Sequence, residues 1–279
     1  MAARPPPPLP DEIVEEILVR VPPDDPARLV RAALACKRWR RLVSGPGFRR
    51  RFRELRPKPP VLGFLRRGFV GDIGEGTVRF IPAWSSGRPR ADRRGWRALD
   101  SRNGRVLLCS EPFWPWHEPA GVPAFAVWDP VADELRELPA LPDLPDTFNA
   151  AVLCAECCDH LDCRREPFTV VFVATHPAGT SAYLYTSEAD AWSEPTSAPH
   201  SAFLIEMERG AHVRNALYFV ISGITGPRIL KYDLGTREMT VIDPPPMSNL
   251  HIVLMTVEGG GLGCITPPVV RNPPVVVGG

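Results

Sequence analysis

Thirty-four prolines and 22 glycines are spread through this chain of 279 residues, and they limit the secondary structure that it can form. A proline lacks the N–H group that a helix interior requires, and a glycine weakens a helix through its conformational entropy. Long helices are therefore disfavoured over most of the sequence. Short strands joined by turns, or partly unstructured connections, suit this composition better.

Residues 9–52 are the exception, because their apolar side chains recur at helical spacing. Asp11 is expected to cap a first helix, and Ile13 and Ile17 belong to its apolar stripe. Residues 22–23 are both proline and end this helix, since neither can donate to the helical ladder.

A second helix is expected to begin at Pro26, after a capping Asp25, because a missing N–H costs nothing at the first helical position. The pattern allows a bend near Cys36. Glycine and proline at 45–47 then break the chain before a third helix around Phe48. The inner face of the second helix is predicted to consist of Leu29, Val30, Ala33, Cys36, Trp39 and Val43.

The order and spacing of these residues resemble the F-box. The resemblance covers the LPDE opening at 9–12, the Ile-Leu pair at 17–18, the double proline at 22–23 and the CKRWR segment at 36–40, followed by Phe48. F-box proteins are substrate adaptors of Skp–cullin–F-box ubiquitin ligases. The resemblance therefore implies that these helices dock on a Skp-type linker protein, while the rest of the chain presents a target protein whose identity the sequence does not show.

The same resemblance implies a particular linker-binding surface. About forty residues in three helices cannot bury every apolar side chain among themselves, and an apolar face left over on so small a unit usually marks a partner-binding site. The alternative is an ordinary helical subdomain that packs on the rest of the chain. The residues that the resemblance assigns to the linker are Leu9, Pro10, Ile13, Ile17, Leu18, Leu29, Cys36 and Trp39.

Residues 61–258 repeat one pattern, in which a strand with an aromatic residue leads through a turn into a second strand that ends near proline. Asn103-Gly104 lies between two such strands and is a strong hairpin signal. Trp128, Tyr185 and Tyr232 recur at intervals of about fifty residues, the period expected of β-propeller blades. The pattern resembles the propeller domains that follow many plant-type F-boxes.

The predicted fold class is α+β, with a three-helix F-box at 9–56 and an all-β, partial or irregular β-propeller-like domain at 61–258. Residues 1–8 are expected to be a proline-rich lead-in and 57–60 a hinge. Residues 259–279 are expected to be disordered, because prolines remove donors from a strand ladder. About four repeat units are recognisable, so the ring is expected to be shortened and to leave a sheet edge open.

Charge and cysteine usage set the expected surroundings of the chain. The net charge is +1, and no run of eighteen apolar residues is present, so neither a nucleic acid nor a membrane is expected as a partner. The basic residues between 37 and 53 alternate with apolar ones and are interpreted as the solvent faces of amphipathic helices. Seven cysteines, an odd number, and the absence of any Asn-x-Ser/Thr sequence favour a reducing compartment, either the cytoplasm or the nucleus.

The segment at 154–163 contains residues that bind zinc in other proteins. Cys154 and Cys157 have the spacing of a zinc site, and His160 or Cys163 could complete a tetrahedral set. No second pair of ligands occurs elsewhere in the sequence, so a polar hairpin loop is the simpler interpretation, and neither a metal nor a cofactor is assigned.

No signature of an enzyme is present, since the sequence contains no P-loop, HExxH or GxSxG motif. No catalytic residue is therefore predicted. The resemblance implies a non-catalytic adaptor. The alternative is a non-catalytic β-repeat interaction scaffold with a vestigial F-box, with or without a stabilising zinc ion.

Overall fold

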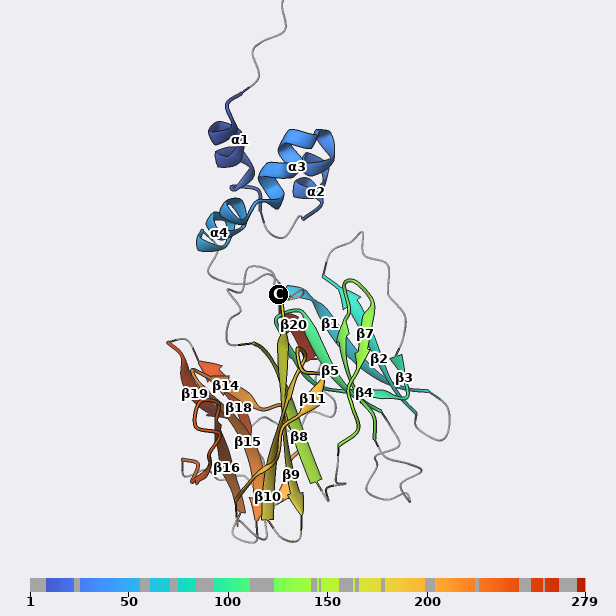
Figure 1. The fold of residues 1–279 in the computed structure, drawn as a ribbon, viewed down its shortest axis with the longest axis vertical. Coiled ribbons are helices and arrows are strands. Elements are labelled where there is room, and N and C mark those ends of the chain that lie inside the picture. Colours follow the sequence, from blue (N-terminus) through green and yellow to red (C-terminus); the bar gives the residue numbers. More distant parts are fainter. Residues whose placement is uncertain are drawn as a thin grey trace, which may run out of the picture.

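The structure is a computed structural model, and its elements are α-helices near the N-terminus followed by β-strands (Figure 1). None of the described helices has the length and apolar character needed to span a lipid bilayer. The structure describes residues 9–22, 26–55, 61–70, 75–83, 93–110, 123–141, 145, 147–155, 163, 166–176, 179–198, 204–223, 226–245, 252–257, 259–265 and 275–278.

Four short helices form where three were expected, because the predicted second helix is divided at Cys36. The backbone of Cys36 is extended, with φ −161° and ψ 160°, and its Sγ accepts a hydrogen bond of 3.4 Å from the N–H of Trp39. Cys36 therefore ends one helix and caps the next. The helices are α1 (Asp11–Leu18), α2 (Pro26–Ala35), α3 (Lys37–Ser44) and α4 (Pro46–Glu54).

The predicted cap of the first helix is also displaced by one residue. Pro10 occupies the N-cap position and has no side-chain donor or acceptor, whereas Asp11 is the first helical residue. Its negative charge still lies in the first turn, where it is favourable for the helix dipole. The predicted cap of α2, Asp25, lies outside the described residues.

The strands form five antiparallel sheets in the described part of the chain, here called A to E. Sheet A has the order β20 (Val275–Gly278), β1 (Val61–Val70), β2 (Glu75–Pro82), β3 (Arg93–Arg94). Sheet B has the order β4 (Trp96–Arg102), β5 (Arg105–Ser110), β6 (Phe125–Asp129), β7 (Glu134–Glu137). Sheet C has the order β11 (Ala191–Trp192), β10 (Gly179–Thr186), β9 (Phe168–His176), β8 (Thr147–Cys154), and β12 (Thr196–Ala198) also pairs with β10.

Sheets D and E complete the array. Sheet D has the order β13 (Leu204–Ile205), β15 (Ala216–Gly223), β16 (Gly226–Asp233), β17 (Met239–Ile242), and β14 (Ala211–Val213) also pairs with β15. Sheet E consists of β18 (Val253–Val257) and β19 (Gly261–Ile265). Successive sheets lie against one another in chain order, and β20 returns the end of the chain to the first sheet (Figure 1).

The cores of the β region lie in the seams between successive sheets. Along β5, Val106 and Leu108 belong to the core between sheets A and B, whereas Leu107 and Cys109 belong to the core between sheets B and C. Side chains alternate along a strand, so β5 is buried on both faces. The same holds for β8 and β9, and this two-sided burial explains why these strands are almost entirely apolar in sequence.

The three aromatic residues that indicated a repeat occupy equivalent places. Trp128, Tyr185 and Tyr232 lie in the third strands of sheets B, C and D, and all three are buried. This confirms the propeller-like repeat. Five positions after each aromatic residue, the turn into the fourth strand contains a residue with left-handed backbone: Asp133 (φ 62°), Asp190 (φ 52°) and Arg237 (φ 60°).

Two strands lie within the stretch at 259–279 that was expected to be disordered. β19 pairs with β18 through a turn at Gly259 and Gly260, whose φ angles of 94° and 75° favour glycine. β20 pairs with β1. The prolines of this stretch lie outside both strands, so they remove no donor from either ladder. Within the described residues none of the sheets is closed, and this arrangement fits an irregular propeller-like domain.

Candidate protein-binding surface

One face of α1 packs into the small core of the helical region. Val14, Leu18 and Val19 are buried, together with Phe48 of α4. Phe48 stacks on Phe52, with ring centroids 5.8 Å apart. This core is supplied by several helices, so α1 is held in place by its own apolar face.

Three large aliphatic residues are exposed to solvent, two on the opposite face of α1 and one just before the helix. Leu9, Ile13 and Ile17 are 52%, 48% and 53% exposed, and they follow one another at intervals of four residues. Ile13 and Ile17 therefore lie on one side of α1, and Leu9 lies two positions before the first helical residue. We call these three residues the α1 stripe. An apolar surface of this kind on a small unit indicates a partner.

The other residues predicted to bind the linker are divided between surface and core. Pro10 and Cys36 are exposed. Leu29 and Trp39 are half-buried and pack against the helical core. Leu18 is 5% exposed and packs inside, so in this conformation it supports the surface rather than presenting a side chain to a partner.

Two exposed residues on α2 were missed or misplaced by the sequence analysis. Val30 was predicted on the inner face, but it is 56% exposed, and Leu34 is 77% exposed. They are four residues apart and lie on one side of α2. Leu29 and Ala32 take the inner positions instead. The sequence signal for this surface was the helical spacing of Val30 and Leu34. It did not decide which face of α2 is buried, because several faces of this alanine-rich helix are equally apolar.

Arginines of the basic segment fix the position of α1 from outside. Arg38 of α3 donates to the carboxylate of Asp11 and, over 2.6 Å, to the carbonyl of Leu9. Arg51 of α4 donates to Glu15 at 3.1 Å and to Glu16 at 2.6 Å. The hydrogen bonds to Glu16 and Glu15 raise the pKa of Arg51. Exposed ion pairs add little stability, so their effect is to orient α1.

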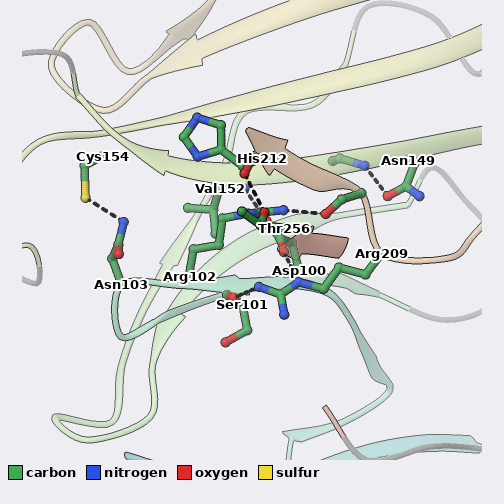
Figure 2. Close-up of polar contacts among 12 residues, drawn as sticks. Asp100, Ser101, Arg102, Asn103, Asn149, Val152, Cys154, Arg209, His212 and Thr256 are labelled. Carbon is green, nitrogen blue, oxygen red and sulfur yellow. Dashed lines mark hydrogen bonds and ion pairs between the residues drawn. The ribbon is translucent and has the colours of Figure 1, made fainter. Parts of the chain in front are cut away.

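In the β region, Asp100 joins three sheets (Figure 2). Its buried carboxylate accepts from Nε of Arg102 and Nε of Arg209, both at 2.8 Å, and from the N–H of Val152 at 3.1 Å. Arg102 also donates over 2.5 Å to the carbonyl of Gly210. These contacts connect β4, β8 and the segment before β14, and they hold the inner strands of sheets B, C and D together.

A second polar cluster links sheets B and C near the outer strands. Arg136 of β7 donates to Asp190 at 3.0 Å, and the hydroxyl of Tyr185 donates to the same carboxylate at 2.7 Å. Burial, aided by the hydrogen bond to Asp190, raises the pKa of Tyr185 to about 12. The hydrogen bonds from Tyr185 and Arg136 hold the pKa of Asp190 below its ordinary value.

The seam between sheets A and B repeats this arrangement. Arg93 of β3 pairs with Asp133 at 2.6 Å, and Nε1 of Trp128 donates to Asp133 at 3.1 Å. In both seams an arginine from the outermost strand of one sheet meets the aspartate that follows the buried aromatic residue of the next. Sheet D has Arg237 at the position of the aspartate, so the seam between C and D lacks this carboxylate.

The predicted zinc alternative remains a hypothesis. Cys154 and Cys163 are half-buried, and Asn103 donates to the Sγ of Cys154 at 3.1 Å. Cys157 and His160 lie outside the described residues. Within the described part of the chain, no group of three metal-binding side chains comes together.

Comparison with known proteins identifies the helical region. The model of the F-box domain matches residues 8–51. Among solved structures, TolB from Acinetobacter baumannii is 11% identical with a TM-score of 0.46, and the alignment covers 81% of this chain and 52% of TolB. Prolyl oligopeptidase B from Galerina marginata is 14% identical with a TM-score of 0.34, over 68% of this chain and 26% of that protein. The comparison with curated proteins found no match.

Proposed function

Residues 8–51 are an F-box domain, and we propose on this premise that the chain is a substrate-recognition adaptor of a Skp–cullin–F-box ubiquitin ligase. The helices dock on a Skp-type linker protein through the α1 stripe, and the sheets recruit a target protein. The observation that carries this proposal is the exposure of Ile13 and Ile17 on one side of α1, whose other side is buried, and of Leu9 just before the helix.

The chemistry of the stripe suits a permanent apolar contact. Burying a large aliphatic side chain completely contributes roughly 1.5–3 kcal/mol. The three residues are about half exposed already, so covering them adds roughly half of that amount for each. Val30 and Leu34 supply further apolar area on α2, and Pro10 and Cys36 are accessible beside the stripe. Leu29, Trp39 and Leu18 support this surface from within.

Charge on the same helices favours fast association. Exposed basic side chains of α3 and α4 include Arg40, Arg41, Arg50 and Arg53. Skp-type linker proteins are acidic, and opposite charges raise the rate of encounter more than the affinity. We therefore expect the association rate constant to fall as ionic strength rises, because salt screens exposed charges.

The proposed adaptor acts by proximity and performs no chemistry itself. It holds a lysine of the target near a ubiquitin thioester that another protein carries, which converts an encounter in solution into a reaction between bound partners. The hydrogen bonds of Asp100 that connect sheets B, C and D suit this role. A stiff β region keeps the target at a fixed distance from the linker. The proposed location is the cytoplasm or the nucleus, where such ligases act.

The test is the affinity of the full-length chain for a purified Skp-type linker protein, measured by calorimetry. The Ile13→Asp/Ile17→Asp variant is expected to bind at least about a hundredfold more weakly, because it places two charges in an apolar contact. The matched control is Ile242→Asp on the exposed side of β17, which should bind like the unmodified chain. Circular dichroism checks that each variant is folded.

Two outcomes would reject the proposal. Equal affinity of the folded stripe variant and the control would place the contact elsewhere. Failure of the unmodified chain to bind any Skp-type linker would favour the alternative, a non-catalytic β-repeat interaction scaffold with a vestigial F-box.

A further inference from the structure

A groove of about 500 Å³ opens between sheets B and C on the side of their turns. Its floor is formed by Arg105 of β5, Val127 of β6 and Phe168 of β9, which are all buried. Leu135 of β7 and Pro167 line its walls. The groove therefore lies where two sheets meet, and residues of four strands shape it.

The two arginines of the groove act as part of its walls. Arg105 lies over the Phe168 ring at 4.9 Å and donates to the carbonyl of Glu166. Arg136 lies over the same ring at 5.6 Å, and it is paired with Asp190, which is outside the groove. The aromatic ring thus already has cations near it, and the charge of Arg136 is matched by a carboxylate.

The rim of the groove is acidic. Glu134, Glu166 and Glu188 line it, the first and last exposed and Glu166 half-buried. Within the described residues no ion pair forms at these three carboxylates. Asp129 adds a fourth carboxylate to the lining, although it accepts hydrogen bonds from the N–H groups of its own turn. The described lining therefore has an excess of negative charge around an apolar wall.

We propose that this groove binds a basic segment of the target protein. A lysine or arginine side chain has an aliphatic stem and a charged end, and it can lay the stem along apolar surface while the charge stays at the wet edge. Leu135 and Pro167 offer the apolar surface, and Glu134, Glu166 and Glu188 offer the counter-charge. An acidic peptide or a nucleic acid phosphate would meet repulsion at the same rim.

This inference rests on the proposed function, because it assigns the recruitment of the target to the seam between B and C. It also gives the two parts of the molecule different tasks that can be measured separately. The linker contacts the helices, and the basic segment contacts the sheets. A change at one site should leave binding at the other site unaltered.

The test uses a labelled hexapeptide in which lysine alternates with leucine, and its binding to the full-length chain is followed by fluorescence anisotropy. The Glu134→Gln/Glu166→Gln/Glu188→Gln variant is expected to bind about tenfold more weakly, since each exposed ion pair contributes a modest amount. The control removes the same charge at exposed glutamates outside the groove, as Glu137→Gln/Glu194→Gln/Glu238→Gln, and should bind within about twofold of the unmodified chain.

The peptides provide a second arm. Replacing lysine by norleucine keeps the stem and removes the charge, and replacing it by glutamate reverses the charge, so both peptides should bind more weakly than the lysine peptide. Equal loss in the groove variant and the control would mean a diffuse charge effect and would overturn the inference. So would the absence of saturable binding of the lysine peptide by the unmodified chain.

Binding of the Skp-type linker is measured on the same variants to separate the two proposals. If the linker binds but the lysine peptide does not, the proposal of a peptide-binding groove is rejected and the proposed adaptor function stands. If the peptide binds through the groove while the unmodified chain does not bind the linker, the proposed adaptor function is rejected and the chain is a peptide-binding scaffold.

Discussion

The helices and the inner sheets of this molecule differ in how fully their apolar side chains are buried. In the helical region, Val14, Leu18, Val19 and Phe48 are buried, while the α1 stripe, Val30 and Leu34 lie in solvent. In the β region, strands such as β8 and β9 are buried on both faces between neighbouring sheets. A unit of four short helices has too little interior for its apolar residues, whereas a sheet that lies between two others has an interior on each of its faces.

This difference indicates where each region can bind a partner. A strand buried on both faces has no apolar surface to offer, so contacts with a target must be made at turns, edges and seams. The groove between sheets B and C is such a place. The α1 helix, in contrast, is amphipathic on a small scaffold and offers the middle of its outer face. Exposed apolar residues therefore indicate the partner-binding surface of the helices, and polar residues at turns and seams indicate that of the sheets.

The largest expected effect on stability comes from the aromatic core between sheets B and C. Phe172 is buried among Phe125, Phe148 and Trp192, at centroid distances of 5.1, 5.0 and 6.1 Å. Phe172→Ala should lower the free energy of unfolding by about 3–5 kcal/mol, because it leaves a cavity in the core. Ile17→Ala on the α1 stripe should change it by less than about 0.5 kcal/mol. Urea denaturation measures both, and a large loss for Ile17→Ala would contradict the division into core and contact surface.

The next effect concerns the carboxylate that joins the sheets. Asp100→Ala should cost about 3 kcal/mol of unfolding free energy, because it leaves Arg102 almost buried without its counter-charge. The partly exposed Arg209 can turn to solvent and reduces the loss. The matched control is Asp243→Ala, which removes an exposed partner of Arg228 and should cost less than about 1 kcal/mol. Similar losses for the two variants would show that Asp100 does not hold the seams together.

The smallest effect is a pH dependence at the seam between B and C. Hydrogen bonds from Tyr185 and Arg136 hold the folded-state pKa of Asp190 below its ordinary value. The unfolded chain therefore binds this proton more readily, so the stabilisation is present above about pH 4 and is lost as pH falls through the lowered pKa. Asp190→Asn should melt below the unmodified chain at pH 7, and the difference in melting temperature should shrink by pH 3. A difference that stays constant between these pH values would contradict this assignment.

Local sequence signals predicted the elements that depend on near neighbours. The Asn103-Gly104 turn has φ angles of 50° and 76°, as its residues indicated, and it joins β4 to β5. The spacing of Trp128, Tyr185 and Tyr232 likewise predicted repeated sheets. A helical period also indicated an amphipathic α1, because the period depends only on residues within two turns of each other.

Contacts between distant residues could not be read in the same way. Asp100 and Arg209 are separated by 109 positions, and nothing near either residue specifies the other. The pairing of β20 with β1 joins the two ends of the β region. The prolines and glycines of residues 259–279 had suggested a disordered tail instead. On α2 the period placed Leu29 and Val30 next to each other, but only the packed structure shows that Leu29 turns inward and Val30 outward.

Hydrogen–deuterium exchange of the full-length chain, with and without a purified Skp-type linker protein, tests whether the linker contacts the helices and leaves the sheets free. Exchange reports local opening, which a docked partner suppresses. We expect slower exchange in residues 9–18 when the linker is bound, and unchanged exchange in β8, β9 and β10. Protection that appears in these strands while residues 9–18 exchange as before would contradict this expectation.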